Sequence, residues 1–528
     1  MSAPGQTLEE PLNPYRWLIL VGLIMAAVME VLDTTIVNVS LPQMAGNLGT
    51  TSEEIGWVST GYILSNVVVL PMTAWLSSRF GRKNYLSGSI LLFVIASFFC
   101  GSSSTLGALV FWRIVQGAGG AALLSTAQAT LREIFPKEQQ GIVQSIYVLG
   151  IIVAPTLGPT VGGWITDNYS WHWNFYINLP IGAVSLFLVY NFLSDSKFQT
   201  RNNKVDWLGV GLLAVGLGCL QYLLEEGNAK SWFESQLIIN LAIVSLITLP
   251  TFIWWQLNPK NELPVVNLRV LKNRDLSAAL VLFVALGFGL YGGVFIYPMF
   301  AQNVMGLTPT LTGMTLLPGG IMTGVGAILC GRLLSGAKPA FDPRIAIFAG
   351  FSIFVVSMWM MSALPSNASA DNLFIPLILR GFGLGLLFVP INLAAFSSLK
   401  GAEIAQGSGL MNLCRQLGGS FGIAAIGSYV TRTVQNARAE LVTNVYAGNP
   451  ALTQKVNAIS HGLIARGVPP ANAPKAAMAA INGGLMKEAA TIAYNSGFMM
   501  ILAAALLTAP LIFILRKPQS AAAPVDAH

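Results

Sequence analysis

The sequence predicts an all-α membrane protein with fourteen transmembrane helices. Of its 528 residues, 54% are hydrophobic and only 10% are charged, whereas a soluble domain carries about 25% charged residues. A mean hydropathy of +0.64 excludes a water-soluble surface of ordinary composition. Apolar runs of about 20 residues, which suit a bilayer core about 30 Å thick, recur fourteen times between polar connectors that contain glycine and proline.

Basic residues indicate how these spans are oriented. An even number of spans places both termini on one side of the membrane. Nineteen lysines and arginines lie in the tails and loops of that side, whereas the short loops opposite contain only Lys230. Because basic residues accumulate on the cytoplasmic side, we expect both termini in the cytoplasm. These loops also explain the net charge of +7, so we expect no nucleic-acid partner.

Two related halves of six spans are expected around an inserted hairpin. Span 4 reads "FWRIVQGAGGAA" and span 12 reads "ILRGFGLGLLF", an arginine followed by glycines in both cases. The predicted order is an N-terminal tail (1–14), a first half (15–194), a two-span hairpin (207–256), a cytoplasmic linker (257–275), a second half (276–515) and a C-terminal tail (516–528).

Two further expectations concern the surroundings of this bundle. The hairpin carries few polar residues inside the membrane, so we expect it to flank the bundle rather than line the pathway. The segment 431–494, an outer-side loop between spans 13 and 14, is rich in alanine at helical spacing. We therefore expect this segment to be largely helical.

The first span contains two carboxylates near its middle, in "MEVLDTTIVNVSLP" (29–42). Glu30 and Asp33 are three residues apart and share one face of a helix. Charged groups inside a bilayer are costly and are usually functional. Two like charges this close do not ionise together easily, so the pair is expected to take up and release a proton. The alternative is a structural pair that is permanently neutralised.

Arg113 in span 4 is the expected counter-charge of these acids, and Gln116, one turn further, extends the polar face. Arg380 and Arg415 find no intramembrane acid in the second half. They could bond backbone carbonyls, neutralise an anionic substrate or lie at helix ends.

Span 5 is expected to be a bent, closely packed helix. Proline removes a backbone hydrogen bond and kinks a helix, and glycine lets a neighbouring backbone approach. This composition predicts a hinge between the halves, although close packing alone would also explain it. The residues concerned are Gly150, Pro155, Gly158, Pro159, Gly162 and Gly163.

Aromatic and polar residues of spans 4, 9, 12 and 13 are candidates for a substrate pocket. Aromatic side chains adapt to varied apolar ligands, but they are also common in membrane cores. The candidates are Gln116, Tyr291, Phe295, Phe388, Asn392 and Arg415. The sequence offers no metal, nucleotide or hydrolase motif in a suitable context, so we expect neither a metal site nor an enzyme.

Five motifs in order resemble the fourteen-span drug:proton antiporters of the major facilitator superfamily, the EmrB/QacA type. They are "LDTTIVNVSLP" (32–42), "AWLSSRFGRK" (74–83), "RIVQGAGG" (113–120), "GIIVAPTLGPTVGG" (150–163) and "WHWNFYINLPIG" (171–182). The second motif corresponds to a gating loop with Arg79, Gly81 and Arg82, and departs from the family pattern at Ala74 and Ser78. The resemblance covers nearly the whole chain and implies the superfamily fold in a 6+2+6 arrangement.

This resemblance implies a proton-coupled multidrug efflux transporter of the bacterial inner membrane. It would export hydrophobic or amphipathic compounds by alternating access, with the proton gradient in place of a cofactor. Asp33 lies within the family-like signature and would be the obligatory proton site. Glu30 would tune Asp33 by repulsion or meet the cationic end of a substrate, and Arg113 would take part in coupling.

The partners implied are drugs or other lipophilic substrates, protons, the lipid bilayer, a periplasmic adaptor (a membrane fusion protein) and an outer-membrane channel. Two alternatives stay open. One is an exporter of the same fold for a specific metabolite, siderophore or lipid, and the other is a membrane sensor.

Overall fold

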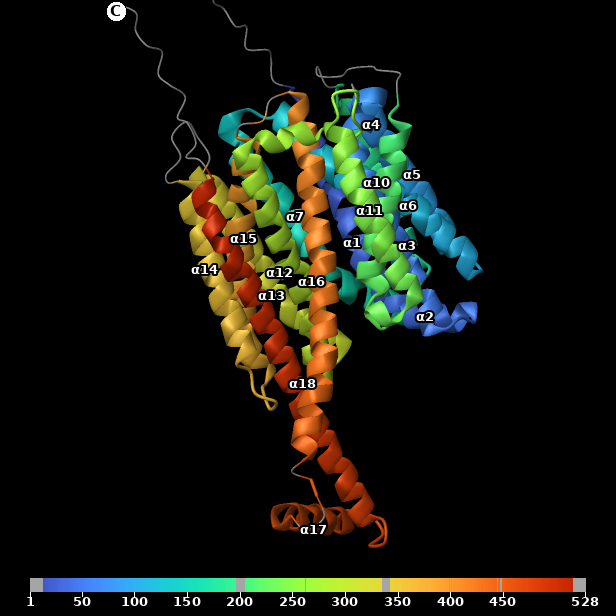
Figure 1. Ribbon diagram of the computed structural model, residues 1–528, viewed down its shortest axis with the longest axis vertical. Coiled ribbons are helices and arrows are strands. Elements are labelled where there is room, and N and C mark those ends of the chain that lie inside the picture. Colours follow the sequence, from blue (N-terminus) through green and yellow to red (C-terminus); the bar gives the residue numbers. More distant parts are fainter. Residues whose placement is uncertain are drawn as a thin grey trace, which may run out of the picture.

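The computed structural model describes residues 13–195, 205–261, 263–334, 342–397, 399, 401–443, 445–446 and 449–515, and all regular structure in these ranges is helical (Figure 1). The predicted tails, 1–14 and 516–528, lie outside these ranges except for residues 13 and 14. A helical chain suits the bilayer because a helix satisfies its own backbone hydrogen bonds without water.

The first half contains six long helical stretches and three short helices. Its elements are α1 (Arg16–Leu48), α2 (Ser52–Ile55), α3 (Trp57–Val69), which runs through η1 (Leu70–Met72) into α4 (Thr73–Phe80), α5 (Arg82–Gly101), α6 (Leu106–Ile134), η2 (Lys137–Gln139), α7 (Gln140–Asn168), α8 (Trp173–Tyr176) and α9 (Asn178–Phe192).

The rest of the chain continues this pattern. The hairpin consists of α10 (Trp207–Glu226), η3 (Trp232–Glu234) and α11 (Gln236–Leu257). The second half follows as η4 (Leu268–Lys272), α12 (Arg274–Asn303), α13 (Pro309–Leu334), α14 (Pro343–Ser362), α15 (Ala370–Phe396), α16 (Ala402–Val442), α17 (Pro450–Ala465), α18 (Ala473–Thr508) and η5 (Ala509–Ile514).

The number of membrane spans can be assigned only partly from these helices. Within the described residues, twelve stretches are long and apolar enough to cross a membrane, or thirteen if the two segments of the bent α7 form one span. The 41-residue α16 is not among them. The predicted count of fourteen is consistent with this but stays a prediction.

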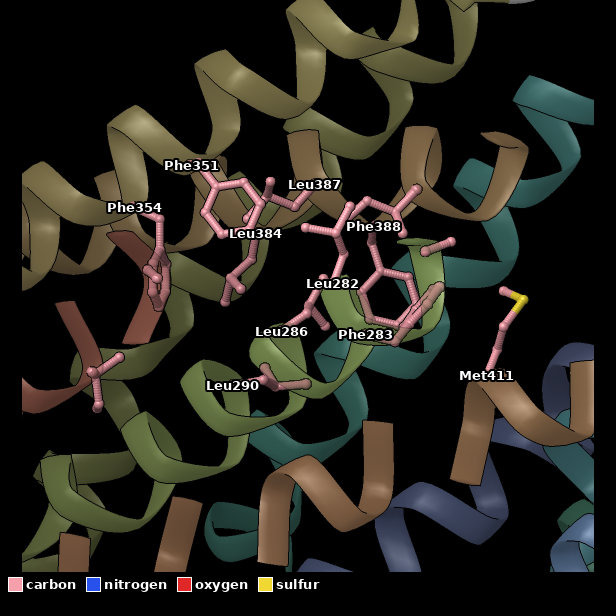
Figure 2. Packing of buried hydrophobic residues seen from close by; sticks show 14 of the residues in the cluster. Leu282, Phe283, Leu286, Leu290, Phe351, Phe354, Leu384, Leu387, Phe388 and Met411 are labelled. Atoms are coloured by element: carbon pink, nitrogen blue, oxygen red, sulfur yellow. The ribbon is translucent and has the colours of Figure 1, made fainter. Parts of the chain in front are cut away.

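Two hydrophobic cores correspond to the two halves. Buried apolar residues of the first core all lie between Ile19 and Leu193. The second core is drawn mainly from residues 265–515 and includes Leu282, Phe283 and Phe388, which Figure 2 shows packed together. The rings of Phe283 and Phe388 meet edge to face at 5.8 Å. In a bilayer such contacts act mainly through close packing, because lipid tails are as apolar as the side chains.

The bundle has two distinct ends. The terminal end is where α1 begins and α18 ends, and the α17 end is the opposite one, from which α17 projects (Figure 1). At 1.5 Å per residue α16 is about 60 Å long, roughly twice the thickness of a bilayer core. The prediction that 431–494 is largely helical is confirmed for its described residues. However, α16 and α18 run into this segment without a break, so it is not a separate loop.

The hairpin lies closer to the pathway than we expected. Its helix α10 packs against α3 of the first half and α16 of the second. Near the α17 end of α10, Gln221 Nε2 donates to Ser420 Oγ of α16 at 2.8 Å and to Glu225 Oε2 at 3.2 Å. Glu225 lines the cavity between the halves, so α10 reaches that cavity at this end, and the expectation that the hairpin flanks the bundle stays a prediction. Polar groups buried between helices need partners, and α16 supplies one.

Candidate functional site

Asp33 and Arg113 form an ion pair inside the first half. Asp33 is 0% exposed and its Oδ2 accepts a hydrogen bond from Arg113 Nη1. Arg113 Nε donates to the carbonyl of Val58 at 2.9 Å, and the guanidinium lies 4.2 Å from the ring centre of Tyr62. The predicted counter-charge of the first-span acids therefore pairs with Asp33.

The second oxygen of Asp33 is also fully occupied. Its Oδ1 accepts from Asn178 Nδ2 at 2.9 Å and from Gln116 Nε2 at 3.1 Å. Gln116 Nε2 donates in addition to Ser97 Oγ at 2.6 Å. Helices α1, α5, α6 and α9 thus surround Asp33, and both of its oxygens accept hydrogen bonds. Gln116, a candidate for the substrate pocket, belongs to this network and does not line the central cavity.

Glu30 has a different environment one helical turn away. It is only 5% exposed, and Oε1 accepts one hydrogen bond, from Asn66 Nδ2 at 3.3 Å. Oε2 has no partner. A Cβ at Gly120 of α6 would lie 2.8 Å from Tyr62 Oη and 3.3 Å from Glu30 Cγ, so glycine is needed for this approach. The carboxylate is therefore buried but incompletely satisfied, which is costly unless another group compensates.

Glu30 lines a cavity between the two halves. About 560 Å³ of space, part of it open to solvent, lies among residues of both halves and the hairpin. Val31 and Thr34 of α1, Tyr291 of α12 and Glu225 of α10 belong to its lining.

The opposite wall of this cavity carries Arg415 of α16, whose charge attracts the carboxylate of Glu30. Arg415 Nη2 donates to Asn412 Oδ1 at 3.3 Å, but Nε has no partner. The acid that Arg415 lacks within the second half is thus supplied by the first half. The repeat itself was the available signal, since it indicated that α1 and α16 come from two halves that face each other.

The remaining candidates for the substrate pocket are dispersed. Tyr291 and Arg415 line the central cavity. Phe388 is buried and lies 5.8 Å from the guanidinium of Arg415, whereas Phe295 packs 3.6 Å from the Cβ position of Gly427. Asn392 lies towards the terminal end, in a cluster that joins the halves.

That cluster holds the two halves together at the terminal end. Gln128 of α6 donates to the side-chain oxygen of Asn392, and Arg132 Nη2 donates to the carbonyl of Asn392 at 3.1 Å. Ser408 Oγ of α16 donates to the carbonyl of Ser125 at 2.7 Å. These contacts seal the terminal end between α6, α15 and α16, while the cavity with Glu30 lies deeper in the bundle.

The helix α7 connects the halves as a bent element. Its segments Gln140–Pro155 and Leu157–Asn168 meet at 45°, as the prolines predicted. One face packs against α1, where a Cβ at Gly150 would lie 3.0 Å from Ile24 and one at Gly162 would lie 2.7 Å from the carbonyl oxygen of Ile36. The other face packs against α13, where Ser145 Oγ donates to the carbonyl of Ala327 at 2.7 Å.

The other residues of the span 5 motif also lie on one of these two faces of α7. Gly158 also faces α1, and Gly163 has only Val39 nearby, at 3.7 Å from its Cβ position. Pro155 and Pro159 line a second cavity against the second half.

The predicted gating loop lies at the terminal end of the first half. Gly81 separates α4 from α5 with φ +89°, a conformation that favours glycine. Arg82 forms an ion pair with Glu133 of α6, and the guanidinium of Arg79 lies 5.6 Å from the ring of Trp75. Both of these contacts lie within the first half.

Comparison with known proteins gives the same picture of the fold. The chain is 32% identical over 444 residues to the multidrug export protein EmrB of Escherichia coli K12. This alignment covers 84% of this chain and 86% of that protein. It is 34% identical over 403 residues to the fatty acid resistance protein FarB of Neisseria gonorrhoeae, with 76% and 78% coverage.

Solved structures share the fold at low sequence identity. The proton:xylose symporter XylE aligns with a TM-score of 0.58 and 14% identity over 97% of this chain and 98% of that one. The human organic anion transporter MFSD10 aligns with a TM-score of 0.55 and 11% identity over 94% and 100%. A sequence model described as Major Facilitator Superfamily matches residues 23–423. The chain therefore belongs to the major facilitator superfamily.

Proposed function

We propose that this protein is a proton-coupled exporter of hydrophobic or amphipathic compounds that works by alternating access. One observation carries the proposal: a buried carboxylate, Glu30, leaves an oxygen unpartnered at a cavity between the halves, one turn from the Asp33–Arg113 pair. A carboxylate in this position can gain a proton on one side of the membrane and lose it on the other. Similarity to proteins named multidrug export proteins supports the substrate class.

Proton coupling is assigned to Glu30, Asp33 and Arg113. Glu30 faces the cavity, so a proton or the cationic end of a substrate reaches it first. Tyr62 lies beside both acids, with its ring over Arg113 and its Oη next to Glu30. Asp33 lies behind Glu30, and a proton on Asp33 would release Arg113 and loosen the network of α1, α5, α6 and α9.

Alternating access would use the contacts between the halves. With the terminal end sealed by Gln128, Asn392 and Ser408, the cavity is set to release substrate towards the α17 end. A proton on Glu30 would weaken its attraction to Arg415 and allow the halves to move. The bend of α7 is the element about which we expect them to move, because it contacts both halves.

The membrane placement follows from the basic loops. We assign the terminal end, with both termini, to the cytoplasm and the α17 end to the outside of a bacterial inner membrane. The projecting helices α16, α17 and α18 then extend well beyond the bilayer. We assign them to docking of a periplasmic adaptor that leads to an outer-membrane channel.

The decisive experiment is transport in proteoliposomes with an imposed pH gradient. Addition of a lipophilic substrate should cause proton movement in proportion to substrate movement, and collapse of the gradient should stop both. Substrate binding without proton or substrate flux would contradict the exporter and favour a sensor.

The second candidate function is export of a specific lipid or metabolite. FarB, whose name refers to fatty acid resistance, is as similar to this chain as the proteins named for multidrug export. A competition series in the same proteoliposomes distinguishes the two: a multidrug exporter is inhibited by many unrelated lipophilic compounds, whereas a dedicated exporter is inhibited by close analogues of one substrate.

A further inference from the structure

Arg380 occupies the same place in the second half as Arg113 does in the first. Each lies on the fourth long helix of its half, α6 or α15, and each reaches the first long helix, α1 or α12. Arg113 meets Asp33 there. Arg380 instead donates from Nη2 to the carbonyl of Leu290 at 3.2 Å. The two arginines thus have corresponding positions, but Arg113 contacts a carboxylate whereas Arg380 contacts a backbone carbonyl.

The residue of α12 that lies against Arg380 is a glycine, Gly293, and not an acid that could pair with the arginine. A Cβ built on Gly293 of α12 would lie 2.7 Å from Arg380 Nη2 and 3.0 Å from Cζ. The titratable neighbour on α12 is Tyr297, whose hydroxyl is bonded to Thr315. In the stretch 276–515 the acids are Asp342, Asp371, Glu403, Glu440 and Glu488.

None of these acids lies beside Arg380. Asp342, Asp371 and Glu403 fall at the beginnings of α14, α15 and α16. Glu440 is in the last turn of α16, and Glu488 of α18 contacts Ser366 in the connector before α15. The guanidinium therefore has no carboxylate partner among the described residues.

An arginine in this position needs a counter-ion. Arg380 is only 6% exposed, and its Nε has no hydrogen-bond partner. Arginine keeps its charge in almost any environment, and a buried charge without a partner is strongly destabilising. The fork of N–H donors suits a carboxylate, which can accept two parallel hydrogen bonds.

The cavity in front of Arg380 is apolar. About 620 Å³ of space, part of it open to solvent, lies between α7 and the second half, and its lining includes Pro155, Pro159, Val294 and Leu316. Among the described side chains of this lining, the polar one besides Arg380 is Thr323, whose hydroxyl already donates to the carbonyl of Gly319 at 2.9 Å. One cation in an otherwise apolar cavity fits a ligand with a single anionic head and an apolar body.

We propose that Arg380 and this cavity form a binding site for lipophilic anions. The carboxylate of the ligand would pair with Arg380 as the carboxylate of Asp33 pairs with Arg113 in the first half. The inference rests on the proposed function, because it names one substrate class of the exporter and a site for it separate from the cavity of Glu30. Since Pro155 and Pro159 line the site, an occupant contacts the bend of α7 directly.

Binding of three probes with the same tail tests this site. Dodecanoate, dodecanol and dodecyltrimethylammonium share an apolar chain and differ in the charge of the head. Purified protein in phosphatidylcholine nanodiscs, without any gradient, should bind dodecanoate more tightly than dodecanol. Arg380→Gln should weaken dodecanoate binding at least about tenfold and leave the other two probes unchanged.

Gly293 provides a matched pair of variants. Gly293→Asp should supply the missing carboxylate, neutralise Arg380 and abolish the preference for dodecanoate over dodecanol. Gly293→Asn adds nearly the same volume without charge and should keep that preference. The flexible end of Arg380 is the nearest neighbour of the added Cβ, so both should fold, and thermal unfolding of each checks this.

Three outcomes would overturn the proposal. They are wild-type affinity of Arg380→Gln for dodecanoate, equal behaviour of Gly293→Asp and Gly293→Asn, or displacement of dodecanoate by phosphatidylglycerol in the nanodisc, which would assign the site to a phospholipid. Failure of the proposed function gives a different result. Proton-coupled efflux would then be absent in proteoliposomes even though the binding differences among the variants persist.

Discussion

Glu30 of α1 and Arg415 of α16 face the same cavity from opposite halves of the molecule, and each keeps one polar atom without a hydrogen-bond partner. Their opposite charges attract, yet they form no ion pair within 4 Å, whereas Asp33 and Arg113 within the first half do. The two groups can therefore move closer and pair. Alternatively, Glu30 can take up a proton, or a charged substrate can bind to one of them. This arrangement gives the first prediction.

Glu30→Gln and Arg415→Gln should each weaken the attraction between the halves and lower the stability of the protein. The double variant should be only slightly less stable than either single variant. We expect a coupling energy of about 0.5–3 kcal/mol, as for neighbouring groups, in thermal unfolding of the purified protein. Additive losses would show that the two side chains act independently. Glu30→Gln should also reduce substrate-induced proton movement, and a full retention of it would remove Glu30 from the coupling mechanism.

Asp33→Asn should abolish gradient-driven efflux and leave substrate binding in the central cavity intact. It should also destabilise the protein by about 3–5 kcal/mol, because Arg113 loses its buried partner. The double variant Asp33→Asn with Arg113→Gln removes both charges and should recover most of this stability. Efflux measured in both variants separates the roles: recovery of transport in the double variant would make the pair structural, and continued loss would make Asp33 the proton site.

The terminal end should open when its contacts are cut. Asn392→Ala removes the partner of Gln128 and should increase labelling of a cysteine at Ala405, which lies between the halves there, by a membrane-impermeant maleimide. Asn191→Ala is the matched control, because Asn191 is exposed and bonds only within its own helix. Equal labelling of the two variants would show that the cluster does not hold this end closed.

Deletion of 440–480 should separate transport from resistance. The deletion removes α17 and the adjoining ends of α16 and α18, none of which lines the cavities of Glu30 and Arg380. Proteoliposomes should therefore retain proton-coupled transport, whereas cells that carry the native adaptor should lose resistance. If resistance is unchanged in such cells, these helices do not dock the adaptor.

The carboxylate of Asp206 should stabilise the hairpin by an amount that depends on pH. Partial burial pushes its pKa up, but hydrogen bonds from Trp255, Gly209, Asn261 and Gln256 outweigh burial, so the pKa of Asp206 lies below its ordinary value of 3.8. A carboxylate with a lowered pKa stabilises the fold above its ordinary pKa and loses this effect as the pH falls through the lowered value.

The corresponding test compares two helix caps. Asp206→Asn should lower the unfolding temperature at neutral pH and make little difference once the pH is below the lowered pKa. Asp342→Asn is the control, since that carboxylate also caps a helix but accepts a backbone hydrogen bond only from Arg344. A loss for Asp206→Asn that is the same at every pH would contradict the role of its charge.

The sequence by itself determined the class of fold and the chemistry that the site contains. Apolar runs of about 20 residues suit helices that cross a bilayer and satisfy their own backbone hydrogen bonds, and hydropathy, prolines and basic loops are local signals that can be read without a structure. For the same reason the bend of α7, the helical segment 431–494 and the pairing of Arg113 with a first-span acid could be predicted.

Only the tertiary structure decided which groups meet. Arg113 could have paired with either acid, and Asp33 is its partner because α5 and α9 supply Ser97 and Asn178 around that carboxylate. The surroundings of Glu30 are set by packing between α1, α3 and α16, which supply the carboxylate, Asn66 and Arg415. Helical periodicity fixes which face of one helix a side chain occupies, but it says nothing about which other helix that face contacts. Arg380 shows this most clearly, since its lack of an acid follows from which residue of α12, Gly293, lies against it.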